Sequence, residues 1–240
     1  MIVLVTGSNG GLGQAIARGF LEDSAESRVL LGVRSNRERA AALAEEFAGR
    51  AEVLDLDVTE PAAWEAAVRG ILDRHGRLDV LVNNAGFHRD ALLATMSDAD
   101  WEAVRRANLD AVFYGCRAVV RPMMAERHGR IVNVASLSAL LAPAGQTNYA
   151  AAKAGVVALT QSLAKETARA GITVNAVCPG YIETEALADL DDERRRELAR
   201  GIPMRRFGKA EEVAAAVRFL AGPEAGYITG AVLKIDGGIF

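Results

Sequence analysis

The 240-residue sequence predicts a doubly wound α/β fold, with a parallel sheet of about seven strands and helices on both faces. Three observations predict it. Short runs rich in Val, Leu and Ile recur along the chain, longer amphipathic stretches separate them, and a glycine-rich turn follows the first run. Because the runs mostly lack polar alternation, we expect each strand to be covered on both faces, as in parallel sheets.

The order of the expected elements follows from these patterns. Strands are expected at residues 2–5, 29–33, 53–56, 80–82, 131–135, 174–177 and 232–235. Helices are expected at about residues 13–23, 36–48, 61–75, 98–127, 147–170 and 209–221. Pro61 in a first turn and Ser97 before Asp98 mark two helix starts. The charged stretch at about 180–207 has no clear period and follows the sixth strand, so we expect it to be mobile and to cover a bound substrate.

Composition and charge argue against nucleic acid and membranes as partners. The net charge is −3 and the aromatic content is 5%, so the chain has neither a strong positive field nor many platforms for base stacking. A leader with a cleavage site and a run of 18 apolar residues are both missing, which favours a cytoplasmic protein. Cys116 and Cys178 lie in apolar runs, and His75, His88 and His128 lie far apart, so no metal site is expected.

The glycine-rich turn "VTGSNGGLG" follows the first strand and opens the first helix. Gly7 permits a tight turn, Gly11 lets the backbone approach a ligand, and Gly13 lets the helix pack closely on the sheet. The free N–H groups of such a helix start suit a pyrophosphate. The alternative is a glycine-rich turn with no ligand, but the position between a strand and a helix favours a Rossmann-like dinucleotide site.

The end of the second strand indicates which dinucleotide is bound. An acidic residue there would bind the ribose hydroxyls of NAD, whereas a basic residue favours the 2′-phosphate of NADP. The sequence "LLGVRSNRER" has Val33 where the acid is expected, and Arg34 follows it. Arg34 can make a charge-assisted contact with a phosphate, so we expect NADP(H), although a solvated loop arginine is the alternative interpretation.

Tyr149 and Lys153 share one helix face because they are four residues apart in "YAAAK". A neighbouring ammonium favours the phenolate, which would bring the phenol closer to the pH range of useful proton transfer. Ser136 ends the fifth strand run, at the edge where parallel sheets bind ligands. Asn108 lies in the middle of an expected helix, where asparagine is an indifferent helix former. Each of these residues alone could be an ordinary satisfied polar group.

The whole chain resembles a short-chain dehydrogenase/reductase, and within that family it is most similar to the 3-oxoacyl-(acyl-carrier-protein) reductases. The resemblance is carried by motifs in a fixed order: "TGSNGGLG" (6–13), "NNAG" (83–86), "HGRIVNVAS" (128–136), "NYAAAKAG" (148–155), "GITVNAVCPGYIET" (171–184) and "GYITGAVLKIDGG" (226–238). It implies a single dinucleotide-binding catalytic domain over residues 1–240, with the substrate-covering segment at about 180–207.

The resemblance also implies roles for individual residues. Tyr149 would be the proton donor, Lys153 would lower its pKa and hold the nicotinamide ribose, Ser136 would fix the substrate carbonyl, and Asn108 would bind a water in a proton relay. The implied cofactor-binding residues are Gly7, Ser8, Asn9, Gly11, Leu12, Gly13, Arg34, Asp57, Val58, Asn84, Ala85, Gly86, Tyr149, Lys153, Pro179, Gly180, Ile182 and Thr184.

Two positions depart from the resemblance. Gly10 stands where the acyl-carrier-protein reductases often have a basic residue, so Arg34 has to carry more of the preference for NADP. His88 stands where a small polar residue is common, beside the substrate entrance. It either alters which acyl chains fit or is only an exposed loop residue.

The implied function is NADPH-dependent reduction of a 3-oxoacyl thioester on an acyl carrier protein, by a homotetramer. An acidic carrier needs local positive charge, for which Arg127, Arg130 and Arg169 are candidates; ordinary solubilising arginines are the alternative. One competing function is another reductase or dehydrogenase of the same family, acting on a small ketone or alcohol, a steroid or a polyketide. Another is a protein that binds dinucleotide without turnover, which need not keep the four polar residues together.

Overall fold

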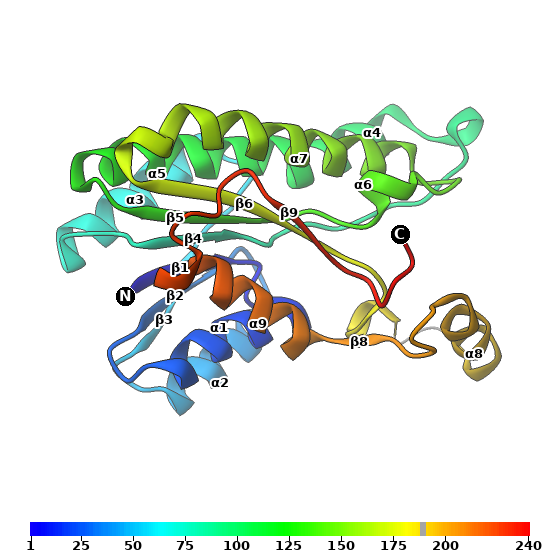
Figure 1. Cartoon of the computed structure of the whole chain (residues 1–240), viewed down its shortest axis with the longest axis horizontal. Coiled ribbons are helices and arrows are strands. Elements are labelled where there is room, and N and C mark those ends of the chain that lie inside the picture. The colour runs from blue at the N-terminus through cyan, green and yellow to red at the C-terminus, as the bar shows by residue number, and fades with distance from the viewer. Residues whose placement is uncertain (188–190) are drawn as a thin grey trace.

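The computed structural model describes residues 1–187 and 191–240, and within these ranges seven strands form one parallel sheet in the order β3-β2-β1-β4-β5-β6-β9 (Figure 1). The strands are β1 (Ile2–Thr6), β2 (Arg28–Val33), β3 (Ala51–Asp55), β4 (Val80–Asn83), β5 (Gly129–Val134), β6 (Ile172–Pro179) and β9 (Val232–Ile235). The chain reverses direction across the sheet between β1 and β4. Doubly wound folds bind their ligands at such a switch point, outside the carboxyl ends of the strands.

Two layers of helices cover the sheet. One face carries α1 (Gly11–Asp23), α2 (Glu38–Glu46) and α9 (Ala210–Ala221), and the other carries α3 (Pro61–His75), α5 (Ala111–Glu126) and α7 (Thr147–Thr167). Strand β1 shows why its sequence lacks polar alternation. Val3 and Val5 enter the core beneath the first layer, while Leu4 enters the core beneath the second, and all three are fully buried.

The expected elements are largely confirmed, with two corrections. The helix predicted at 61–75 is observed with those bounds, but the one predicted at 98–127 is divided into α4 (Asp98–Arg105), a π-helical turn (Arg106–Asp110) and α5. The third strand is predicted at 53–56 and observed as Ala51–Asp55. It lies at the sheet edge with its side chains partly exposed, so its apolar signal is weak.

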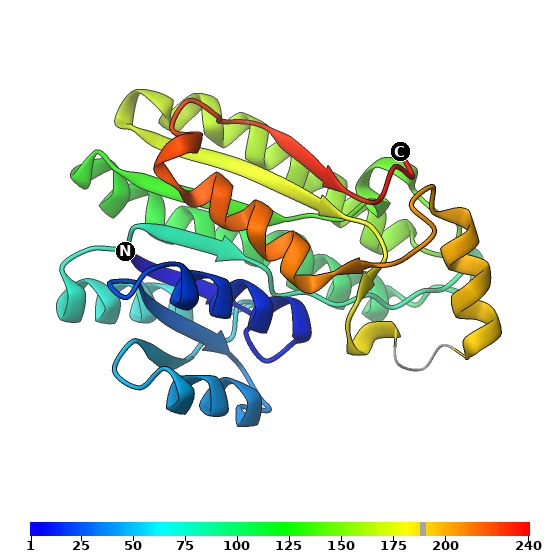
Figure 2. The same ribbon diagram turned by 60° about the horizontal axis from the view of Figure 1, so that its bottom comes forward.

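The stretch predicted at about 180–207 contains regular elements that its sequence pattern does not reveal. Strand β7 (Ile182–Glu183) pairs with β8 (Gly208–Lys209), and α8 (Asp192–Gly201) lies between them in the chain. Helix α8 has no buried residue, so it carries no apolar stripe by which periodicity could reveal it. Residues 188–190 of this stretch lie outside the described residues. Figure 2 shows α8, in gold, beyond the carboxyl ends of the strands.

Other expected features have clear positions. Ser97 begins α4 as predicted, since its hydroxyl accepts a hydrogen bond from Asp100 N at 3.1 Å. Cys116 and Cys178 are buried free thiols. In the described part of the chain, no helix has both the length and the apolar character needed to cross a bilayer.

Candidate active site

The structure brings the four candidate catalytic residues to the carboxyl edge of the sheet. Ser136 follows β5, Tyr149 and Lys153 project from α7, and Asn108 lies in the π-helical turn before α5. We call Asn108, Ser136, Tyr149 and Lys153 the carboxyl-edge cluster. Parallel strands end at one edge, which places Ser136 there, and the π-helical turn and α7 bring the other three residues to it across up to 45 positions of the chain, from 108 to 153.

The Tyr149 phenol is held beside Ser136. Burial raises the pKa of Tyr149 above its ordinary value, and the hydrogen bond with the Ser136 side chain only partly offsets this effect. The Lys153 ammonium lies 5.6 Å from the centroid of the Tyr149 ring. Desolvation is the largest effect on the phenol in this arrangement, and the expectation that the Lys153 ammonium lowers the phenol pKa stays a prediction. The phenol stays protonated at neutral pH and can donate its proton.

Lys153 is a buried cation with one firm hydrogen bond. Its side chain is 3% exposed, and Nζ donates to Val134 O at 2.8 Å. Burial lowers the pKa of Lys153 to about 8. A buried lysine with a lowered pKa at a ligand-binding edge is a functional candidate, because a purely structural role would be better served by an apolar side chain.

Asn108 is fully buried, and only the nitrogen of its side-chain amide has hydrogen-bond partners among the described residues. Its Nδ2 donates to Phe87 O at 2.7 Å and to Val104 O at 2.9 Å, but Oδ1 has no hydrogen-bond partner among the described residues. A Cβ on Gly86 would lie 2.4 Å from Asn108 Oδ1 and 3.5 Å from Lys153 Nζ. The orphaned oxygen therefore points toward the same small space as the lysine. π-helical turns recur at functional sites, and an unsatisfied buried oxygen fits a bound water or ligand group.

The glycine loop between β1 and α1 is shaped for a close backbone approach. Gly7 has a φ of +68° and donates from its N–H to Gly32 O at 2.9 Å. A Cβ on Gly13 would lie 2.3 Å from Gly7 O. The atoms nearest to a Cβ on Gly11 belong to the side chains of Thr184 and Glu185. The first N–H groups of α1 thus face the ligand edge, as a diphosphate requires.

The loop after β4 is fixed to the glycine loop. Thr6 Oγ1 accepts hydrogen bonds from Asn84 N at 2.9 Å and from Ala85 N at 3.0 Å, and Asn84 Nδ2 donates to Thr6 O at 2.8 Å. Ser8 is buried and donates from Oγ to Val5 O at 2.7 Å, so it shapes the loop from beneath. Asn9 reaches Ser35 O at 3.4 Å.

Arg34 is an exposed cation at the end of β2. Its Nη1 lies 3.8 Å from Asp57 Oδ2, and its side chain is 66% exposed. Burial acts to raise the pKa of Asp57. Hydrogen bonds from Thr59 and the charges of Arg34 and Arg106 together outweigh this effect, so the carboxyl pKa is below its ordinary value. An exposed pair of this length is worth little, which leaves the guanidinium available for a phosphate.

The residues predicted to hold the nicotinamide end lie between β6 and the glycine loop. Pro179 O accepts a hydrogen bond from Leu137 N at 2.9 Å, next to Ser136, and Gly180 N donates to Ile235 O at 3.0 Å. Ile182 is buried, and Thr184 comes close to Gly11. Leu12 and Val58 lie on the core side of the site, packed against the two hydrophobic clusters. These contacts place Pro179 beside Ser136 and Thr184 beside the glycine loop, and the binding of a dinucleotide by this set of residues stays a prediction.

A network beside Tyr149 joins residues whose sequence pattern does not predict it. The imidazole of His88 meets the Tyr149 ring edge-on, with centroids 5.9 Å apart. His88 Nδ1 lies 3.0 Å from Asp90 Oδ1, and Gln146 Nε2 donates to Asp90 Oδ2 at 2.9 Å. The residue type at position 88 marks it as unusual, but nothing in the sequence pattern indicates that Asp90 and Gln146 connect it to the loop before α7.

The three candidate docking arginines lie at the opposite, amino edge of the sheet. Arg130 stands near the start of β5, and its Nη1 donates to Gly171 O at 3.3 Å. Arg127 donates from Nη2 to Arg169 O at 3.1 Å. All three therefore surround the turn into β6, on the side away from Tyr149.

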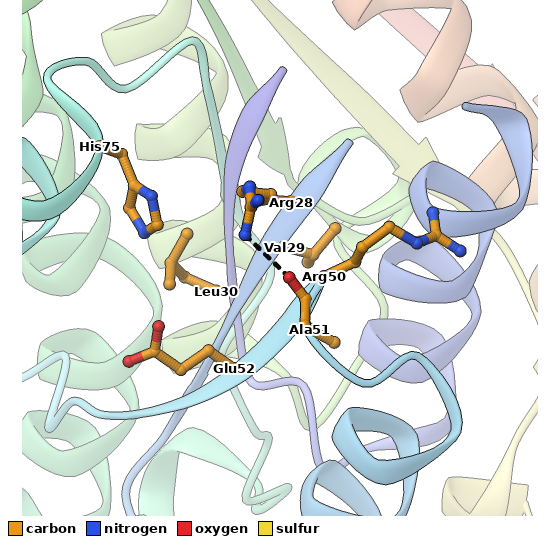
Figure 3. A pocket seen from close by; sticks show the side chains of 8 residues that line it. Arg28, Val29, Leu30, Arg50, Ala51, Glu52 and His75 are labelled. Atoms are coloured by element: carbon orange, nitrogen blue, oxygen red, sulfur yellow. Dashed lines mark hydrogen bonds between the residues drawn. The ribbon is translucent and has the colours of Figure 1, made fainter. Parts of the chain in front are cut away.

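A hollow of about 220 Å³ also opens at the amino edge, at the starts of β2 and β3 (Figure 3). Its lining residues are Arg28, Val29, Leu30, Gly49, Arg50, Ala51, Glu52 and His75. Arg28 Nη1 donates to Gly49 O at 2.8 Å and Arg50 Nη1 to Leu21 O at 2.7 Å, so both cations already have partners. The hollow is on the wrong side for the ligands of a parallel sheet, and we assign it no role.

Comparisons with known proteins cover nearly the whole chain. The family model described as "Enoyl-(Acyl carrier protein) reductase" matches residues 7–239. A 3-oxoacyl-[acyl-carrier-protein] reductase of Vibrio harveyi is 44% identical over 239 residues, which are 100% of this chain and 97% of the relative. The enzymes of that name from Escherichia coli (strain K12) and Chlamydia pneumoniae are each 42% identical, over 239 and 240 residues, covering 100% and 99% of this chain and 97% and 96% of the relatives.

Proposed function

Because the chain belongs to the short-chain dehydrogenase/reductase family, we propose that it reduces a 3-oxoacyl thioester on an acyl carrier protein to the 3-hydroxyacyl form, using NADPH. The observation that carries the proposal is the carboxyl-edge cluster, in which a protonated phenol and a serine hydroxyl lie together at the ligand edge. The family model is described by an enoyl reduction, but the full-length relatives are named for the ketone reduction, and a phenol beside a hydroxyl suits a carbonyl oxygen.

In the proposed reaction the cofactor supplies a hydride to the keto carbon, and the protein supplies position and a proton. The Ser136 hydroxyl donates to the substrate carbonyl oxygen and fixes it beside Tyr149. Tyr149 protonates that oxygen as negative charge develops on it. The Lys153 ammonium stabilises the resulting phenolate. Asn108 Oδ1, which has no partner among the described residues, accepts from a water that returns a proton through Lys153.

The preference for NADPH over NADH is part of the proposal. The family uses a nicotinamide cofactor, and Arg34 supplies an exposed cation at the end of β2. We expect Arg34→Ala to weaken NADPH binding by about tenfold to 100-fold, the worth of a charge-assisted contact, while NADH binding stays within about twofold. The measurement is a titration of each variant with NADPH and with NADH, in which the fluorescence of the bound reduced nicotinamide gives the two dissociation constants. Equal weakening of both cofactors would contradict the assignment.

The buried Lys153 predicts a pH dependence. The ammonium is the useful form and its pKa is about 8, so its protonated fraction falls as the pH rises through that value. We therefore expect kcat/KM for NADPH to be flat below about pH 7 and to fall about tenfold per pH unit well above pH 8. Tyr149 does not cause this limb, because burial raises its pKa. A profile that stays flat to about pH 9.5 would show that the lysine charge is not needed.

Docking of the carrier by Arg127, Arg130 and Arg169 and assembly as a homotetramer stay predictions. A carrier held by these arginines would face the edge opposite to its own chain's Tyr149, so the docking proposal requires a second subunit to supply the active site. Exposed apolar side chains on α5, Phe113 at 44% and Met124 at 43%, offer one surface for association. A cytoplasmic location is likewise proposed.

The test of the function is an assay of NADPH oxidation with a 3-oxoacyl carrier protein, repeated with NADH and with a panel of ketones. We expect the carrier-bound or small-thioester 3-ketone to be the preferred substrate and NADPH the preferred cofactor. Preference for a steroid, a polyketide or a small simple ketone would instead support the alternative function within the same family. Binding of NADPH without turnover of any ketone would identify a cofactor-binding protein.

A further inference from the structure

The carboxylate of Glu185 lies on the glycine loop. Its Oε2 accepts a hydrogen bond from Gly11 N at 3.1 Å, although the two residues are 174 positions apart. Its Oε1 pairs with the guanidinium of Arg39, in the first turn of α2. A Cβ on Gly11 would lie only 2.7 Å from Oε2, so the carboxylate occupies the space that the glycine leaves open above the backbone.

This contact has the chemistry of an anion on a helix N-terminus. Gly11 is the first residue of α1, whose first turn contains no acidic residue and whose N-cap, Gly10, supplies no side-chain hydrogen bond. The N–H groups at this end have no partner inside the helix and favour negative charge. The pKa of Glu185 is below its ordinary value, because of a hydrogen bond with its own backbone, the pairing with Arg39 and the Gly11 N–H, so the group is ionised.

We propose that Glu185 is an internal competitor of the cofactor, which holds the diphosphate position of the glycine loop until a dinucleotide displaces it. The inference rests on the proposed function, because it takes the loop to be a diphosphate site. A carboxylate and a diphosphate cannot share the Gly11 N–H, and two anions placed together there repel each other. Displacement also releases Arg39 from its pairing with Glu185.

The same contact connects cofactor binding to the segment that carries β7. Glu185 follows directly after the residues predicted to hold the nicotinamide end, and Glu183 pairs with Arg195 of α8 at 2.5 Å. While Glu185 is bound to Gly11, this segment is held against the loop. The apparent cofactor affinity is reduced by the fraction of molecules in which Glu185 is in place.

The variant that tests the proposal is Glu185→Ala, with Glu183→Ala as the matched control. Both remove one carboxylate from the same segment, but the Glu183 carboxylate pairs with Arg195, and among the described residues it makes no hydrogen bond to the glycine loop. With the full chain and no substrate, we expect Glu185→Ala to bind NADPH about threefold to tenfold more tightly than the wild type. We expect Glu183→Ala to stay within about twofold.

A second measurement does not involve the cofactor. In the free chain, amide hydrogen exchange over residues 9–12 should be faster in Glu185→Ala than in the wild type and in Glu183→Ala, because the Gly11 N–H loses its acceptor. Unchanged exchange in Glu185→Ala would show that Glu185 does not hold the Gly11 N–H. Unchanged or weaker NADPH binding by this variant would show that Glu185 does not compete with the cofactor. Equal tightening in the control variant would also overturn the competition, because general charge would then be the cause. If the wild-type chain binds no dinucleotide while its exchange still differs from that of Glu185→Ala, the contact is present and the proposed function is overturned instead.

Discussion

Replacing Tyr149 by phenylalanine is expected to lower kcat for 3-oxoacyl thioester reduction by about 10²-fold to 10⁴-fold, the usual contribution of a positioned general acid. The ring remains in its partly buried position beside Lys153 and only the hydroxyl is lost, so NADPH should still bind with a dissociation constant within about threefold of the wild-type value. A loss confined to kcat is the signature of a group that acts on the transition state. The measurement is steady-state kinetics together with a direct binding titration.

Tyr114→Phe is the matched control for this loss. Tyr114 lies on α5 with its ring against the guanidinium of Arg117, and among the described residues its hydroxyl makes no hydrogen bond to the carboxyl-edge cluster, so deletion of this hydroxyl should leave kcat close to the wild-type value. Wild-type turnover in Tyr149→Phe would show that the phenol is not the acid. A loss of NADPH binding equal to the loss of turnover would show that the hydroxyl is needed for the cofactor and not for the proton.

Gly13→Ala is expected to disrupt the glycine loop. The added Cβ would lie 2.3 Å from the backbone oxygen of Gly7 and 2.9 Å from Asn84 Nδ2, and a backbone atom cannot move aside without shifting α1 or the loop. Overpacking of this kind costs about 1–3 kcal/mol, which lowers Tm by several degrees in a chain of this size. Because the shift moves the N–H groups of α1, we also expect NADPH affinity to fall by at least about tenfold.

Gly70→Ala separates this steric effect from the general effect of adding a methyl group to a helix. Gly70 lies within α3, and among the described residues no atom from outside its own helical turns comes within 4 Å of the added methyl group. The change should raise stability by up to about 1 kcal/mol, since alanine is the better helix former. Thermal unfolding of both variants is the measurement. A Gly13→Ala protein with unchanged Tm and NADPH affinity would show that the loop does not need the close approach.

The sequence predicts most of the sheet because its strands are buried on both faces. The exceptions have physical causes. Strand β3 is at the edge and only partly buried, so its predicted bounds are displaced from the observed ones. Helix α8 buries nothing, so it gives no periodic signal. The π-helical turn at Asn108 interrupts a pattern that otherwise reads as one helix, because the turn changes the backbone bonding without removing the apolar residues on either side.

The site is predictable to the extent that topology determines it. Ser136 follows a parallel strand, and the phenol and ammonium of "YAAAK" share a helix face, so their meeting follows from the fold. The contact between Glu185 and Gly11 could not be predicted, since it depends on how the segment after β6 returns to the loop. The direction in which the pKa of Tyr149 is shifted also depends on burial, which local sequence does not show.

The proposed reaction delivers a hydride to the carbon and a proton to the oxygen of one ketone carbonyl. The most direct measurement uses NADPH with deuterium at both C4 positions of the nicotinamide and a 3-oxoacyl thioester as substrate. We predict one deuterium at C3 of the 3-hydroxyacyl product, with the hydroxyl proton drawn from solvent through Tyr149. A product that carries no deuterium at C3, or no consumption of the ketone by the wild-type protein, would contradict this reaction.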